Sequence, residues 1–308
     1  MALTDFLSQY QHAVDKHGAL SGSKLAAEKA VERSLVQLGK KINYGERPVE
    51  KEWDALIILD ACRADLFAEF APQHPVYEAF ETTTSIYSCA STSSEWFRKA
   101  FGSASDTELS KIHYLSANLF SNCVDPNRFH EMTELWRFVA EDKKHCDPAE
   151  VTAEALRANH ESDAERLVIH YIPPHAPFLH CTGKYDLESP VWGGDSHQVW
   201  LGLQSGEFDR AEVWNDYGQN LLTVLDEVDT LLTHLSGTIA ITADHANGLG
   251  ELGVYGHPGY SPVPAVKRVP WATAVGQGQP YSVSDFDALM DRSEVSNTEE
   301  QLEALGYL

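Results

Sequence analysis

The chain has 308 residues, of which 43% are hydrophobic and 22% are charged, a balance typical of globular rather than disordered proteins. Acidic residues outnumber basic ones by 46 to 23, giving a net charge of −23. Because nucleic acids and anionic lipid surfaces both attract basic proteins, this charge argues against either as a partner. We interpret the scattered acidic residues as a strongly solvated surface.

Five cysteines are spread widely along the sequence and include no C-x-x-C pair: Cys62, Cys89, Cys123, Cys146 and Cys181. An odd number at such spacing argues against a disulfide framework and favours a reducing compartment. The N-terminal stretch is polar, unlike a secretory signal, and no window is apolar enough to cross a bilayer. We therefore expect a soluble, cytoplasmic protein without a transmembrane segment.

The first 50 residues predict a helical extension to the domain that follows. Apolar residues from Leu25 to Leu38 recur at helical spacing, and Gly39 is a typical helix end. The stretch Gly45–Pro48 indicates a linker. We therefore divide the chain into an N-terminal helical extension, residues 1–50, and a second domain, residues 51–308.

Three continuous apolar runs predict strands that are buried on both faces: Ala55–Leu59, Leu167–Ile172 and Gly237–Ala243. Between the last two, leucines and valines from Leu221 to Leu235 repeat at spacings of three and four, which predicts a helix. Strand, helix and strand in this order favour parallel strands with a right-handed crossover. The predicted fold class is therefore α/β, a three-layer α/β/α sandwich with a mainly parallel sheet. The polar stretch Thr182–Phe208 is expected to form a long loop or lid over the sheet edge.

Each of these runs is followed by polar side chains that could carry chemistry. Asp60 follows the first run, His175 the second, and Asp244 with His245 the third. The carboxyl ends of parallel strands share one crevice, so these groups are expected to converge on a divalent-metal site. Carboxylates alone suit Mg²⁺ or Ca²⁺, whereas an added histidine favours Mn²⁺, Zn²⁺ or Fe²⁺. The alternative is that each residue merely ends or caps a strand.

Residues 82–94 contain nine serine and threonine hydroxyls, and Glu95-Trp96-Phe97 follows them. Ser91 or Ser93 would be a suitable N-cap for a helix that begins here. The functional interpretation is a nucleophile at a helix N-terminus, where free N–H groups favour an anionic substrate. Both interpretations can hold together.

Four further segments, taken in order along the chain, contain recognisable motifs. The first is Ala55-Leu-Ile-Ile-Leu-Asp60-Ala-Cys-Arg63-Ala-Asp65, and the second is Tyr171-Ile-Pro-Pro-His175-Ala-Pro-Phe178. The third runs from Thr242 to His257 with glycines at 248, 250, 253 and 256, and the fourth is Gln301–Leu308. In this order the four segments resemble motifs of the alkaline phosphatase/sulfatase superfamily. The resemblance implies an alkaline phosphatase-like fold from about residue 53 onward, with the glycine-rich segment lying over a tetrahedral anion.

The resemblance also implies a role for each matching residue. Asp60, Asp244 and His245 would bind the metal ion. His175 and His257 would contact the phosphate or sulfate group or protonate the leaving oxygen. Ser93 would be the nucleophile, with Thr92 and Ser91 as alternatives.

Some positions depart from the family pattern. Ala61 stands where sulfatases usually have a second aspartate, and Ala246-Asn247 replaces a Gly-Glu pair. The segment Cys89–Ser93 lacks the proline and arginine of the C-x-P-S-R motif, whose cysteine becomes formylglycine. These departures favour a hydroxyl nucleophile acting on phosphate esters.

The sequence therefore predicts a metal-dependent hydrolase or transferase that acts on phosphate or sulfate esters through a Ser/Thr nucleophile. We expect one divalent ion, Mn²⁺ or Zn²⁺ by preference and Ca²⁺ or Mg²⁺ as alternatives. The substrate would be a small-molecule or a glycan- or lipid-linked ester. Two alternatives remain: a formylglycine sulfatase, and a non-catalytic relative that binds anionic glycans or head groups. The sequence does not define an oligomeric state.

Overall fold

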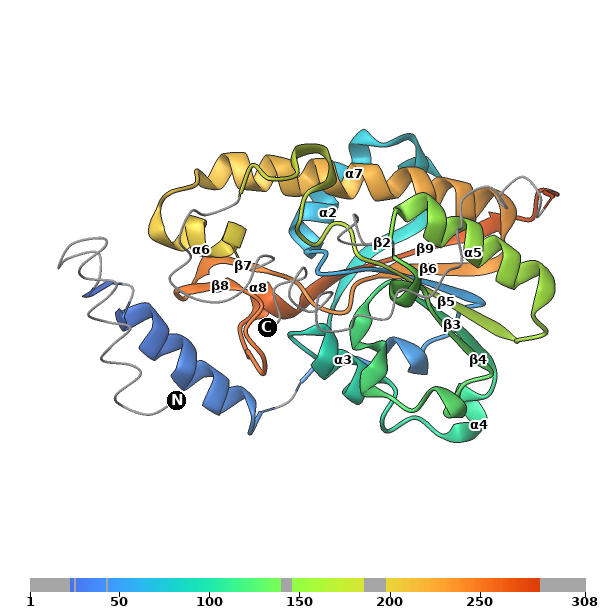
Figure 1. The fold of residues 1–308 in the computed structure, drawn as a ribbon, viewed down its shortest axis with the longest axis horizontal. Coiled ribbons are helices and arrows are strands. Elements are labelled where there is room, and N and C mark those ends of the chain that lie inside the picture. Colours follow the sequence, from blue (N-terminus) through green and yellow to red (C-terminus); the bar gives the residue numbers. More distant parts are fainter. Residues whose placement is uncertain (1–22, 25, 43, 140–145, 186–197, 283–308) are drawn as a thin grey trace.

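A computed structural model describes residues 23–24, 26–42, 44–139, 146–185 and 198–282. At its centre is a seven-stranded sheet with the order β2-β9-β6-β1-β5-β3-β4 (Figure 1). These strands are β1 (Ala55–Leu59), β2 (Phe80–Tyr87), β3 (Ile112–Ser116), β4 (Glu131–Glu134), β5 (Arg166–Tyr171), β6 (Ser236–Thr242) and β9 (Arg268–Gln277). β9 pairs antiparallel with both of its neighbours, and the other pairings are parallel. The predicted mainly parallel sheet is therefore confirmed.

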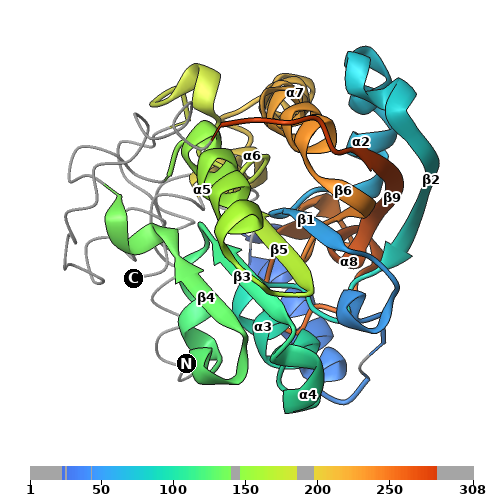
Figure 2. The same ribbon diagram turned by 90° about the vertical axis from the view of Figure 1, so that its right-hand side faces the viewer.

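Helices cover both faces of the sheet, which gives three layers (Figures 1 and 2). The helices are α2 (Ala64–Phe70), α3 (Ser93–Ala100), α4 (Asp106–Leu109), α5 (Pro148–Glu161), α6 (Gln198–Ser205), α7 (Arg210–His234) and α8 (Pro264–Lys267). Helices α2, α5 and α7 lie on one face of the sheet, whereas α3 and α4 lie on the other. Residues 26–39 are also helical, as predicted, and this helix ends at Gly39.

The central strand β1 shows why the sheet needs a layer on each face. Ile57 and Leu59 belong to the apolar cluster under α2, α5 and α7, whereas Leu56 and Ile58 belong to the cluster under α3. All four side chains are fully buried. Successive side chains of a strand point to opposite faces, so a continuous apolar run is stable only between two helical layers.

Two segments differ from the sequence prediction. The stretch expected to be a long loop contains α6, and its Trp200 is buried against Tyr217 of α7; residues 186–197 lie outside the described part. The glycine-rich segment forms an antiparallel hairpin of β7 (Gly248–Glu251) and β8 (Val254–Gly256). Gly253 at its turn has φ of +73°, which glycine adopts without strain.

Two further predictions remain untested. The Gln301–Leu308 segment lies outside the described residues. The domain boundary near residue 50 stays a prediction.

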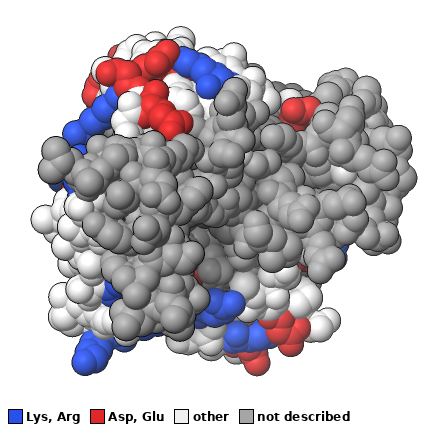
Figure 3. Space-filling model, turned by 60° about the vertical axis from the view of Figure 1, so that its left-hand side comes forward, with Lys and Arg blue, Asp and Glu red and all other residues white. Residues whose placement is uncertain are grey.

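Acidic side chains on the face shown in Figure 3 lie among lysines and arginines in its described part. This mixture of signs is consistent with a solvated surface.

The N-terminus of α7 provides a test of the fold. The exposed Asp209 side chain accepts hydrogen bonds from the backbone N–H groups of Ala211 and Glu212. We expect Asp209→Ala to lower the free energy of unfolding by about 1 kcal/mol in urea titrations. Asp229→Ala, at an exposed mid-helix position of α7, is the matched control and should leave stability within about 0.5 kcal/mol. Equal losses in both variants would contradict the capping role.

Candidate metal centre

Asp60 and Asp244 lie next to each other because their strands are neighbours. β1 and β6 pair in parallel, with Ala55 opposite Ile239 and Ile58 opposite Thr242. Asp60 follows the end of β1, and Asp244 lies two residues beyond the end of β6. Both side chains are almost completely buried. Asp60 Oδ1 and Asp244 Oδ2 lack hydrogen-bond partners among the described residues, so each is available to a cation.

His245 completes a set of three ligand atoms that lie within 4.8 Å of one another. Its Nδ1 faces the backbone oxygen of Ala246 at 3.2 Å, and a carbonyl can only accept, so Nδ1 carries the proton. The Nε2 lone pair then points into the cluster, 3.6 Å from Asp60 Oδ1 and 3.5 Å from Asp244 Oδ2. Two free carboxylate oxygens and one imidazole lone pair fit a divalent ion such as Zn²⁺ or Mn²⁺.

Nearby histidines keep the Asp60 carboxylate ionised. Burial by itself raises the pKa of Asp60, but His170, His175 and His245 outweigh that effect and lower the pKa to about 2. An ionised carboxylate is the form that a metal ion requires. Asp60 is therefore prepared as a ligand at neutral pH.

Ser93, the first residue of α3, is the candidate nucleophile that faces this cluster. Its Oγ lies 3.3 Å from His245 Nε2 and 3.5 Å from Asp60 Oδ2. The predicted cap is corrected by one residue, because Thr92 is the N-cap of α3 and accepts from the Glu95 N–H. Ser91 instead contacts Glu95 and Pro258, and it accepts from the Ser261 N–H. Thr92 and Ser91 thus serve the local structure, whereas Ser93 adjoins the metal ligands.

His175 and His257 lie beside the same cluster. The ring of His257 is 4.5 Å from that of His245 and 5.2 Å from that of His175, measured between centroids. His175 Nδ1 donates to the Ala176 oxygen, and His257 Nδ1 contacts Asn247 Oδ1 at 2.7 Å. His175 Nε2 is buried and has no hydrogen-bond partner in the described part of the chain. Both predicted histidines therefore lie with the predicted metal ligands.

The sequence analysis missed two side chains of this centre, Asn118 and His170. Asn118 Nδ2 donates to Asp60 Oδ2 from just beyond β3, a strand that the analysis did not predict. His170 lies inside β5, with Nε2 3.7 Å from Asp60 Oδ2 and 4.0 Å from Asp244 Oδ2. Its Nδ1 is 2.9 Å from the Tyr114 hydroxyl. The sequence signal that could have identified His170 is its position within an otherwise apolar, buried run.

Arg63 links the segment that follows Asp60 to the segment that follows His245. Its buried guanidinium donates to Asp65, to the backbone oxygen of Asn247 and to Glu251. These bonds join the segment after Asp60 to the segment after His245. The Ala61 N–H adds a bond of 3.0 Å to Asp244 Oδ1.

Neither a family model nor a curated protein matches the sequence. Among solved structures, the soluble domain of lipooligosaccharide phosphoethanolamine transferase A from Neisseria meningitidis is similar, with a TM-score of 0.51 and 14% identity over 73% of this chain and 76% of that one. The integral membrane protein of the same name, from the same organism, gives a TM-score of 0.51 and 16% identity over 80% of this chain and 54% of that one. This chain therefore spans about half the length of that protein.

The fold is alkaline phosphatase-like. A protein of the alkaline phosphatase superfamily from Vibrio parahaemolyticus is also similar, at 13% identity over 82% of this chain and 70% of that one, with a TM-score of 0.40. The mainly parallel sheet between two helical layers agrees with the α/β/α fold class predicted from the sequence. None of the described helices is long and apolar enough to cross a membrane.

Removal of one ligand tests the metal centre. We expect Asp244→Ala to bind one equivalent less Zn²⁺ or Mn²⁺ than the unaltered protein, measured by elemental analysis after dialysis. Its circular dichroism spectrum should be retained, because the change removes charge rather than apolar packing. Asp229→Ala serves as the control and should bind metal normally. Full metal content in Asp244→Ala would refute the assignment.

Proposed function

We propose that the chain transfers or hydrolyses a phosphate ester in a metal-dependent reaction, with Ser93 as the nucleophile. The observation that carries this proposal is the position of the Ser93 hydroxyl. It lies at the N-terminus of α3 and within 3.5 Å of two of the three metal-ligand side chains. A hydroxyl that only capped the helix would not need to adjoin a carboxylate and an imidazole. The capping function itself belongs to Thr92.

Asp60, Asp244 and His245 would hold the metal ion. When bound, a divalent ion lowers the pKa of a neighbouring hydroxyl and offsets the charge of the transferred group. The first turn of α3 supports the same chemistry, because its free N–H groups favour negative charge at Ser93. The almost complete burial of Ser93 strengthens these electrostatic effects.

The reaction would proceed through a covalent phosphoserine. The Ser93 hydroxyl loses its proton to water, and its oxygen forms a bond to phosphorus while the ester P–O bond breaks. The leaving oxygen takes a proton from a nearby side chain. His175 and His257 are the candidate donors, each through Nε2 when its ring is protonated, since Nδ1 of each ring is engaged with an oxygen. Water then releases phosphate in a hydrolase, whereas an acceptor hydroxyl takes the group in a transferase.

The surroundings of Cys89 favour phosphate over sulfate. Cys89 is buried in the apolar cluster under α3, with Trp53 and Trp96. Burial raises the pKa of its thiol to about 11. A packed cysteine outside the ligand cluster does not resemble a residue that supplies the catalytic aldehyde. These observations support the hydroxyl mechanism over the formylglycine alternative.

The substrate class and cellular location are part of the same proposal. The transferase from Neisseria meningitidis is named for lipooligosaccharide and phosphoethanolamine. We infer that a lipid- or glycan-linked phosphate ester is the substrate class to test first. The cytoplasmic location remains our proposal and is supported by the odd number and wide spacing of the five cysteines.

Trapping the intermediate tests the nucleophile. We expect Ser93→Ala to lower turnover of an aryl phosphate on the order of 10³-fold or more and to abolish the phosphoserine found by mass spectrometry. Metal content should be unchanged. Ser94→Ala, at the adjacent hydroxyl, is the control and should retain activity. If Ser93→Ala turns over substrate normally and Thr92→Ala or Ser91→Ala loses turnover, the nucleophile is that other residue. If the metal-loaded wild-type protein is inactive, the result favours the binding-only alternative.

Substrate preference tests phosphate against sulfate. We expect aryl phosphate to be turned over faster than aryl sulfate, with more stimulation by Mn²⁺ or Zn²⁺ than by Ca²⁺. Cys89→Ser should not change the rate, because the thiol takes no part in the proposed reaction. Preference for sulfate, together with an aldehyde at residue 89 and an inactive Cys89→Ser protein, would identify a sulfatase instead.

A further inference from the structure

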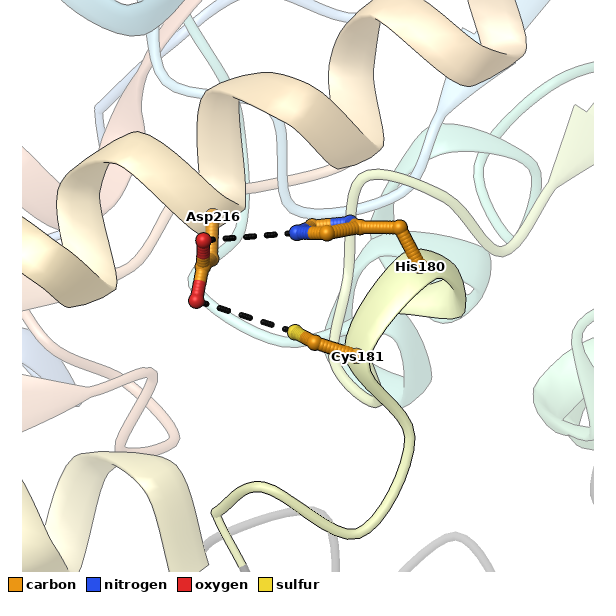
Figure 4. A group of neighbouring side chains, drawn as sticks. All are labelled: His180, Cys181 and Asp216. Carbon is orange, nitrogen blue, oxygen red and sulfur yellow. Dashed lines mark hydrogen bonds and ion pairs between the residues drawn. The ribbon is translucent and has the colours of Figure 1, made fainter.

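A second group of metal-ligating side chains joins the short 3-10 helix Leu179–Cys181 to α7 (Figure 4). His180 Nε2 lies 3.3 Å from Asp216 Oδ1, and Cys181 Sγ lies 3.7 Å from Asp216 Oδ2. The three ligand atoms lie within 4.8 Å of one another. The group shares no residue with the centre at Asp60.

The spacing and chemistry of these atoms fit a small thiophilic cation. Ligands bound tetrahedrally to Zn²⁺ at about 2.0–2.3 Å are separated from each other by about 3.3–3.8 Å. The shortest distances from Asp216 to His180 and to Cys181 fall in this range, although each is measured from a different carboxylate oxygen. Sulfur and nitrogen donors together select Zn²⁺ over Mg²⁺ or Ca²⁺. The Tyr185 hydroxyl donates to Asp216 Oδ2 and holds the carboxylate in place.

A positive charge already occupies the edge of this group. Lys184 Nζ lies 2.5 Å from Asp216 Oδ2 and 2.8 Å from Glu212 Oε1. Glu212 precedes Asp216 by one turn of α7, so both carboxylates lie on the same face of the helix. An incoming ion would displace Lys184 from Asp216 while Glu212 retains it. The His180 side chain is 34% exposed, which leaves a path from solvent.

We propose that His180, Cys181 and Asp216 form a second metal site for Zn²⁺ or another thiophilic divalent ion, with Lys184 as its competing internal cation. Binding forms a metal–sulfur bond and releases the thiol proton of Cys181 to solvent, with no change in oxidation state. Water would complete the coordination. The proposal is independent of the ester chemistry at Ser93.

Such a site would fasten the segment that carries His175. Asn220, one turn beyond Asp216 on α7, donates to the backbone oxygens of Pro174 and His175 and accepts from the Leu179 N–H. An ion bound by His180 and Cys181 would add a second link between this segment and α7. We therefore assign the site a structural role.

Cobalt titration of the full-length, chelator-treated protein tests the proposal, because the Asp60 centre contains no thiol. Co²⁺ bound by a thiolate gives a charge-transfer absorption in the near ultraviolet. We expect this band to be complete within two equivalents of Co²⁺ in the unaltered protein, which has both sites, and at one equivalent in Asp244→Ala. Cys181→Ser should abolish the band, whereas Cys123→Ser, a matched change at another partly exposed cysteine, should retain it.

Two further variants separate the roles of ligand and competitor. His180→Ala should weaken Co²⁺ affinity at least about tenfold, since it removes one of three ligands. Lys184→Met should strengthen affinity by about tenfold or more, because it removes a positive charge from beside the site. No band in the unaltered protein, a band that persists in Cys181→Ser, or unchanged affinity in Lys184→Met would each overturn the proposal. Thermal unfolding of each variant, followed by circular dichroism, confirms that the protein tested is folded.

Discussion

Two carboxylates buried side by side impose the constraint on which the candidate centre depends. Asp60 and Asp244 follow adjacent parallel strands and are shielded from water, so their negative charges repel each other in a medium of low dielectric. His170 Nε2 and His245 Nε2 lie within 4.0 Å of both carboxylates, but the unprotonated Nε2 of His245 cannot offset that repulsion. One oxygen of each carboxylate still lacks a partner among the described residues. A divalent cation would satisfy both oxygens at once, whereas one histidine proton could not.

The departures from the superfamily pattern have identifiable structural roles. Asn247, which replaces a glutamate of the motif, contacts His257 Nδ1 through its side chain and accepts from Arg63 through its backbone oxygen. Ala61 adopts a left-handed backbone conformation, with φ of +59°, and its N–H donates to Asp244. Its oxygen accepts from the Tyr217 hydroxyl. Asn247 thus orients His257 through the side chain that replaces the glutamate, whereas residue 61 acts through its backbone.

The sequence predicted the parts of the centre that follow long apolar runs. Asp60, His175, Asp244 and His245 could be found because a strand buried on both faces is apolar throughout and its end is marked by a polar residue. Asn118 could not be found in this way, since β3 contains His113 and Tyr114 and lacks a continuous apolar pattern. The hydroxyl-rich segment predicted the start of α3 but not its cap, because Ser91, Thr92 and Ser93 are chemically equivalent as caps. The three residues differ only in the direction in which each side chain points, which the structure shows and the sequence does not.

The segment after β5 links the two candidate sites physically. It carries His175 to the metal centre and, a few residues later, His180 and Cys181 to Asp216. Asn220 already binds the backbone on both sides of His175, so α7 sets the position of that imidazole. Asp216 lies one turn earlier on the same helix, and its bonds to Lys184 and Tyr185 hold the far end of the segment. The proton donation proposed for His175 needs such support, because a displacement of about 1 Å lowers catalytic efficiency on the order of a hundredfold.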